Sequence, residues 1–137
     1  MFKTETSVRV RYAETDQMGF VYYGRYAEYF EVARVECLAS LGLRYKELEN
    51  KGIWLPVISY SVKFLKPAGY DDVITIYTTI PQLPGARISF TYFCENSSGD
   101  LICEAQTDLV FLNAETKKPV KAPANLVKAL TPWFPVN

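Results

Sequence analysis

The sequence contains no histidine among its 137 residues. This absence excludes Ser-His-Asp and Cys-His catalysis, because both need an imidazole as the general base. It also excludes metal sites built on histidine, and the cysteines show no C-x-x-C spacing that would hold zinc. We therefore expect no metal site and no cofactor. Acid–base chemistry at neutral pH falls to carboxylates, lysines, tyrosines or backbone dipoles.

Cysteine is scarce and odd in number, with thiols only at Cys37, Cys94 and Cys103. An odd count, in a chain whose first residues MFKTETS carry no secretion signal, argues against a disulfide framework. Residues 97–100, SSGD, predict a hairpin with a two-residue loop, which would place Cys94 directly opposite Cys103. We interpret this pair as two small residues of the hydrophobic core.

The charges balance, and no long apolar run is present. Lysine plus arginine number 15, as do aspartate plus glutamate, so no overall field attracts nucleic acid or an anionic membrane. No apolar stretch reaches the length of a membrane span. With 49% apolar and 22% charged residues, the chain is expected to fold as one domain over residues 1–137 rather than stay disordered. We expect a soluble, cytoplasmic protein that binds no nucleic acid.

The rest of the chain is arranged around residues 8–42, which predict a strand, a polar turn and a long helix. Val8, Val10 and Tyr12 alternate with arginines, which is the period of a half-buried strand. Gly42 suits the left-handed residue that commonly follows a helix. Before it, apolar residues recur every three or four positions and predict one buried helix face: Tyr26, Phe30, Ala33, Cys37 and Leu41.

Downstream, alternating and β-branched segments predict strands at 56–66, 73–80, 88–94 and 101–112, and short helices are expected at 45–48 and 125–130. The expected order is a strand, one long helix and then four strands of an antiparallel meander. A curled sheet of this kind must wrap an apolar element, and only the long helix can supply it. The residues alone therefore predict an α+β domain with a curled sheet around a central helix, a description that several folds satisfy.

Asp16 lies in the polar turn between the first strand and the helix, close to Gly19 in the segment ETDQMG. Judged from residue types alone, an aspartate in such a loop is most often a turn former or a helix cap. In a chain without histidine, a carboxylate is also the kind of group that serves as a base or a nucleophile. Both roles are compatible with the residues of this turn.

The segment around this turn carries a resemblance to a known family. Its pattern, D-x-x-G-x-V-Y-Y-x-x-Y, is similar to the signature of hotdog-fold acyl-CoA thioesterases of the 4-hydroxybenzoyl-CoA thioesterase type. Residues 56–76, PVISYSVKFLKPAGYDDVITI, resemble that family's second and third strands. The resemblance implies a hotdog fold and an acyl-CoA substrate. It also implies a homodimer or homotetramer, in which two subunits join their sheets edge to edge and complete each active site.

The resemblance further implies roles for single residues. Asp16 matches the family's catalytic carboxylate, acting either as nucleophile or as general base. The backbone N–H of Tyr23, at the start of the helix, would polarise the thioester carbonyl. Gly19, Tyr22 and Gly24 would lie against the substrate, although packing of aromatic rings also accounts for tyrosines at these positions.

Arg87 resembles the position where family members hold the CoA phosphates, and Lys63 and Lys66 are weaker candidates. Glu31 and Arg34, three positions apart on the helix, are interpreted as a structural pair. Two alternatives to hydrolysis remain: a non-catalytic module that binds acyl-CoA or acyl carrier protein, and a structural oligomer. A hotdog dehydratase is disfavoured because its usual catalytic histidine is absent. Aromatic, short aliphatic and long-chain acyl groups all fit the sequence.

Overall fold

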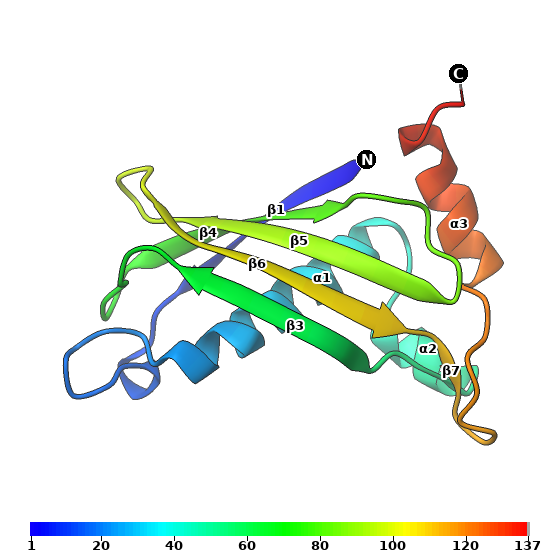
Figure 1. Cartoon of the computed structure of the whole chain (residues 1–137), viewed down its shortest axis with the longest axis horizontal. Helices are drawn as coiled ribbons and strands as arrows, with labels where there is room; N and C mark the ends of the chain where they lie inside the picture. The colour runs from blue at the N-terminus through cyan, green and yellow to red at the C-terminus, as the bar shows by residue number, and fades with distance from the viewer. Residues whose placement is uncertain (137) are drawn as a thin grey trace.

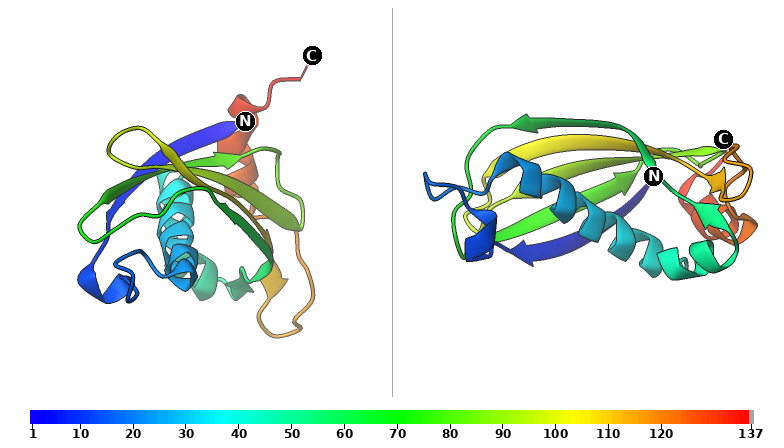
Figure 2. Two further views of the ribbon diagram at one scale, coloured as in Figure 1. Left: turned by 60° about the vertical axis from the view of Figure 1, so that its left-hand side comes forward. Right: turned by 90° about the horizontal axis from the view of Figure 1, so that it is seen from below.

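A computed structural model describes residues 1–136 and shows a curled antiparallel sheet with one long helix, α1, lying against its concave face (Figure 1; Figure 2). Helix α1 spans Tyr26–Ser40. The main sheet has five strands in the order β1-β4-β5-β6-β3. Their bounds are Phe2–Arg9 (β1), Val57–Phe64 (β3), Val73–Ile80 (β4), Arg87–Glu95 (β5) and Leu101–Val110 (β6). The α+β class and the sheet curled around a central helix are confirmed.

Helix α1 buries the apolar face that its sequence predicted, except for Leu41, which is half-buried just after the last helical residue, and Gly42 follows as predicted. Tyr26, Phe30, Ala33 and Cys37 are all buried against the sheet. Gly42 has a φ of +83°, its N–H donates to the Ala39 carbonyl at 2.9 Å, and the next N–H donates to the Leu38 carbonyl at 3.0 Å. These paired bonds satisfy carbonyls that the end of a helix leaves free.

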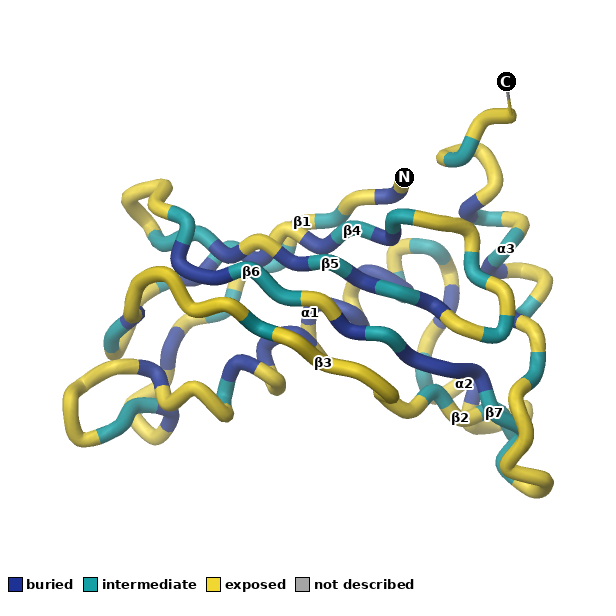
Figure 3. Tube along the Cα trace, in the orientation of Figure 1, coloured by how far each residue is buried: buried dark blue, intermediate teal, exposed yellow. Residues whose placement is uncertain are grey.

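The hydrophobic core lies between α1 and the inner face of the central strands, where Figure 3 shows buried segments along β4, β5 and β6. Phe30 of α1 stacks on Tyr92 of β5 with ring centroids 4.5 Å apart. Each fully buried large side chain contributes about 1.5–3 kcal/mol relative to exposure. Strand β3 differs from these strands, because Val62 is half-buried and every other residue of the strand is exposed.

Short elements connect and cover the main layers. Helix α2 and the terminal helix α3 confirm the two short helices that the sequence predicted. Two short strands, β2 and β7, pair with each other beyond the end of the main sheet. The bounds are Tyr12–Glu14 (3₁₀ helix η1), Tyr23–Arg25 (η2), Tyr45–Asn50 (α2), Ile53–Trp54 (β2), Leu112–Asn113 (β7), Ala124–Leu130 (α3) and Thr131–Trp133 (η3).

The first strand begins and ends earlier than predicted, so the assignment of residues 8–12 to a strand is largely wrong. Strand β1 ends at Arg9, and Tyr12 lies in η1 with 77% of its surface exposed. Val10 is buried as expected, but its N–H donates to the Asp72 carbonyl at 2.9 Å, outside the β1–β4 ladder. The polar Thr and Glu residues of 3–7 hid the true strand, which pairs with β4 along its whole length.

The predicted four-strand meander is also wrong, because β3 pairs with β6 and not with β4. The connection 65–72 is not a tight turn and crosses the end of the sheet. Leu65 N–H donates to the Ile102 carbonyl at 2.9 Å, and the Ala68 carbonyl accepts the N–H of Val21 at 2.8 Å. Alternation tells which face a residue occupies but not which strand is its neighbour.

The β5–β6 hairpin places Cys94 opposite Cys103, as predicted, and both are buried free thiols. Its loop spans residues 96–100 and is longer than the predicted two residues. The Asn96 side chain explains the difference, since its Oδ1 accepts the N–H groups of Ser98 at 3.0 Å and Asp100 at 2.9 Å. Within residues 1–136, no helix is long and apolar enough to cross a membrane.

Candidate active site

Asp16 organises the turn between η1 and η2. Its Oδ1 accepts the N–H groups of Met18 at 2.9 Å and Phe20 at 3.2 Å, and its backbone carbonyl accepts the N–H of Gly19 at 3.0 Å. Gly19 has a φ of +82°, a conformation that costs an L-residue about 1–2 kcal/mol. The turn-forming role is therefore present. It uses only one oxygen, and Oδ2 accepts no hydrogen bond from the described residues.

The helix start lies immediately after this turn. The Tyr22 N–H donates to the Glu14 carbonyl at 2.8 Å, and the Arg25 N–H returns to the Tyr22 carbonyl at 2.9 Å. Tyr23 opens η2, which runs directly into α1, and its own N–H has no backbone acceptor within residues 1–136. A free N–H at the first turn carries the positive end of the helix dipole. This confirms that the helical segment starts at Tyr23, as predicted.

Gly24 lies close to the ring of Tyr22. A Cβ built on Gly24 would lie 2.8 Å from that ring, so a side chain at this position would require the exposed ring to move. The rings of Tyr22 and Tyr23 pack on each other at 4.5 Å, so the aromatic packing expected for them is present. Both rings are exposed rather than buried in the core.

Asp16 and Tyr23 line one open groove of about 310 Å³. The groove lies between the Asp16 turn, the start of α1 and the end of β3, where Tyr26 meets Phe64 with ring centroids 5.2 Å apart. An acidic residue and the residue that opens the helical segment thus border the same space. The other lining residues are mostly apolar: Met18, Phe20, Val21, Tyr26, Phe64, Leu65, Lys66 and Pro67.

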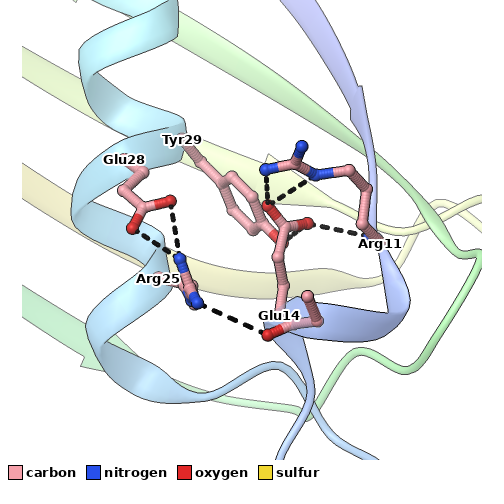
Figure 4. Close-up of polar contacts among 6 residues, drawn as sticks. Arg11, Glu14, Arg25, Glu28 and Tyr29 are labelled. Atoms are coloured by element: carbon pink, nitrogen blue, oxygen red, sulfur yellow. Dashed lines mark hydrogen bonds and ion pairs between the residues drawn. The ribbon is translucent and has the colours of Figure 1, made fainter.

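A buried carboxylate, Glu14, fixes the backbone that leads into this groove, and sequence reasoning missed it (Figure 4). Its Oε1 accepts the Arg11 N–H at 2.8 Å and the Tyr29 hydroxyl at 2.9 Å. Its Oε2 accepts Arg11 Nε at 3.3 Å and Nη2 at 3.2 Å. Beside it, Arg25 pairs with Glu28 at 2.9 Å. The network ties η1 to α1 on either side of the Asp16 turn.

Glu14 is expected to stabilise the protein in a pH-dependent way. Burial raises the pKa of Glu14, but the hydrogen bonds from the Arg11 N–H, the Tyr29 hydroxyl and the Arg11 guanidinium outweigh it and hold the pKa below its ordinary 4.5. A lowered folded-state pKa means that the stabilisation is complete above the unfolded pKa and is lost as pH falls through the folded pKa. Glu14→Gln should lower the free energy of unfolding at pH 7 by about 1–3 kcal/mol.

Thermal unfolding of both proteins between pH 7 and pH 3 checks this. The difference between wild type and Glu14→Gln should shrink below the ordinary pKa of 4.5. Glu28→Gln is the matched control, because Glu28 is exposed and its ion pair with Arg25 is worth about 1 kcal/mol or less. A pH-independent difference, or equal losses at both sites, would contradict the role given to Glu14.

Of the other predicted site residues, only Lys66 lines the groove within one chain, whereas Gly19, Tyr22, Gly24, Lys63 and Arg87 do not. Lys63 faces the side of the sheet opposite α1, directly across from Glu104 of β6. Arg87 pairs with Val110 at the far end of the β5–β6 ladder from Cys94, and it stays a prediction as a phosphate contact. Lys66 does line the groove, where its Nζ lies 3.5 Å from the Asp100 carboxylate.

Comparison with known proteins agrees with this geometry. A family model described as the thioesterase-like superfamily matches residues 10–130. The putative acyl-CoA thioesterase YneP of Bacillus subtilis is 32% identical over 121 residues, covering 88% of each chain. The acyl-CoA thioester hydrolase YbgC of Escherichia coli is 31% identical over 120 residues, covering 88% of this chain and 90% of YbgC.

A solved structure matches the whole described architecture. The DHNA-CoA thioesterase from Staphylococcus aureus superimposes with a TM-score of 0.85 at 32% identity, over 98% of this chain and 85% of that chain. The matched region contains the Asp16 turn, α1 and the five strands of the main sheet. The chain belongs to the thioesterase-like superfamily of hotdog-fold proteins.

Proposed function

We propose that this protein hydrolyses acyl-CoA thioesters in the groove between Asp16 and the start of α1. Asp16 acts as nucleophile or general base, and the Tyr23 N–H polarises the thioester carbonyl. The observation that carries the proposal is that Asp16 and Tyr23 line one mostly apolar groove in a chain of a thioesterase family. The names of the relatives YneP and YbgC support an acyl-CoA substrate.

The chemistry needs two things that these residues provide. An oxygen nucleophile must reach the carbonyl carbon, and the carbonyl oxygen must be stabilised as it becomes negative. As a nucleophile, Asp16 forms a mixed anhydride and expels CoA as its thiolate, and water then cleaves the anhydride. As a base, Asp16 takes a proton from the attacking water. Both routes consume one water and release one carboxylic acid and one thiol.

Thiol release from a panel of acyl-CoAs tests the function. The expected result is that free CoA and the matching acid appear in equal amounts with multiple turnovers. The protein's own thiols are buried, so they add little to the signal in the folded state. Saturable binding of an acyl-CoA without thiol release would instead identify a non-catalytic binding module.

Strand β3 supports assembly into a homodimer or homotetramer as part of this function. It is one of the two edge strands of the sheet, β1 being the other, and its apolar side chains are exposed, including Val57 (44%), Ile58 (47%) and Phe64 (47%). An exposed, apolar edge strand pairs readily with another strand. Pairing across β3 also covers the side of the groove that Phe64 lines.

Arg87 then becomes a candidate contact for the CoA phosphates across subunits, because it is remote from Asp16 in its own chain. Arg87→Ala should raise KM for acyl-CoA and leave kcat nearly unchanged, since a remote anchor is used equally in ground and transition states. Hydrolysis of the matching acyl-pantetheine, which lacks the nucleotide, is the control and should scarcely change. Equal losses on both substrates would indicate a structural role for Arg87.

A further inference from the structure

Arg34 is a buried cation whose charge is not neutralised within the chain. Only 6% of its surface is exposed. Its Nη1 donates to the Tyr92 hydroxyl at 3.3 Å, and its Nε has no hydrogen-bond partner among the described residues. The ion pairs formed within residues 1–136 do not include Arg34. Removing a charge from water without a counter-ion is costly. This position therefore calls for an anion.

The acid expected to pair with Arg34 does not do so within one chain. Glu31 is exposed and makes no ion pair there, so the predicted Glu31–Arg34 pair is wrong for the isolated subunit. A side chain at i does not reach its i+3 neighbour when that neighbour turns inward toward the sheet, as Arg34 does toward Tyr92. The helix thus presents a free acid beside an unneutralised base.

Both residues line one cavity at the open edge of the sheet. The cavity has a volume of about 300 Å³ and lies between α1 and β3. Val57 and Tyr60 of β3 form its other wall, and Tyr60 packs against Phe30 with ring centroids 6.1 Å apart. Tyr60 is 43% exposed, so the cavity opens on the unpaired strand edge. Whatever covers this edge meets both charges.

We propose that a second copy of this chain covers the cavity, with Glu31 of the partner subunit as the counter-ion of Arg34. The surface is self-complementary in charge, as an isologous interface requires. Within residues 1–136, each copy presents here one unpaired acid, Glu31, and one cation without a counter-ion, Arg34. In this arrangement the two β3 edges meet in antiparallel order and the two α1 helices run antiparallel. A two-fold axis level with residues 32 and 33 of α1 then sets Glu31 of each copy opposite Arg34 of the other, and both residues line the cavity that opens on this edge.

Charge reversal on α1 tests the pair without involving hydrolysis. Glu31→Lys places a like charge opposite Arg34 of the partner subunit and should raise the dimer dissociation constant at least tenfold in sedimentation equilibrium. Glu36→Lys is the matched control, since Glu36 is an exposed acid on the same helix that lines a separate groove beside β1. It should leave the dissociation constant unchanged. Equal effects at both positions would overturn the proposal.

Mixing two variants separates a pair between subunits from one within a subunit. Arg34→Glu alone should also weaken the dimer. A mixture of Glu31→Lys with Arg34→Glu should recover dimers near the wild-type affinity, because in the heterodimer each acid meets a base. A pair within one chain gains nothing from mixing. Failure to recover, with both variants folded by circular dichroism, overturns the proposal, as does a wild-type protein that is monomeric at micromolar concentration.

Because position 34 is buried, a second variant is needed in case the first does not fold. If Arg34→Glu does not fold, Arg34→Met replaces it, because an unbranched apolar side chain suits the same cavity. Its mixture with Glu31→Lys retains one complete pair per heterodimer and should associate more tightly than Glu31→Lys alone, whereas no gain counts against the pair. The inference rests on the proposed homo-oligomer. Since association and thiol release are measured separately, failure of one is distinguishable from failure of the other.

Discussion

Asp16→Asn is expected to remove most turnover, with kcat falling roughly 10²–10⁴-fold, the usual contribution of a positioned acid–base group. An amide is neither a base nor an effective nucleophile, and no histidine exists in the chain to replace the carboxylate. The turn should survive the change. The amide oxygen of Asn accepts the Met18 and Phe20 N–H groups as Asp16 Oδ1 does. The loss should therefore appear in kcat and not in the melting temperature.

The measurement is steady-state thiol release on the best acyl-CoA, with thermal unfolding of each protein alongside. Asp71→Asn is a suitable control, because Asp71 is an exposed acid paired with Arg9 and lies outside the groove. It should keep wild-type kcat. A folded Asp16→Asn protein that retains near wild-type kcat would show that another group performs the chemistry.

The second large effect is expected from Tyr23→Pro, which removes the backbone N–H that the proposed mechanism uses. Loss of one donor to a developing oxyanion typically lowers kcat about 10²–10³-fold. Proline fits at this position for two reasons. It is favoured at the first residue of a helical segment, and the preceding Tyr22 already has the extended conformation that proline imposes, with φ −62° and ψ 131°.

Tyr23→Phe is the matched control, since it keeps the N–H and removes only the hydroxyl of an exposed ring. It should turn over at close to the wild-type rate. If the phenylalanine and proline variants lose activity equally, the side chain is the functional part of Tyr23. If neither loses activity, the oxyanion lies elsewhere.

The sequence predicted the elements better than their arrangement. Periodicity located α1, because one buried stripe from Tyr26 to Cys37 satisfies a helix and no strand. Gly42 marked its end for a local steric reason. Strand neighbours depend on contacts between distant residues, so the β3–β6 pairing did not follow from alternation. Strand β1 was missed for the opposite reason, because its polar residues carry little apolar signal.

The candidate site divides in the same way. Residue types alone favoured a turn-forming role for Asp16. The motif that Asp16 shares with thioesterases suggested a catalytic role, and the position of Asp16 beside Tyr23 in one groove supports it. Nothing in the sequence marked Glu14 as buried, because it is one of 15 acidic residues and such residues are usually exposed. Its role became visible only with its hydrogen-bond partners Arg11 and Tyr29 in the structure. The i, i+3 spacing of Glu31 and Arg34 suggested a pair, but it did not show that Arg34 turns inward.

The most direct test of the central claim is a structure of the protein with an acyl-CoA analogue in which a methylene replaces the thioester sulfur. Such a ketone keeps the carbonyl but has no thiol to release. The account predicts the carbonyl oxygen about 2.7–3.1 Å from the Tyr23 nitrogen. It predicts the carbonyl carbon within about 3–3.5 Å of an Asp16 carboxylate oxygen, or one water molecule away. A fully occupied analogue whose carbonyl lies outside the groove between Asp16 and Tyr23 would contradict it.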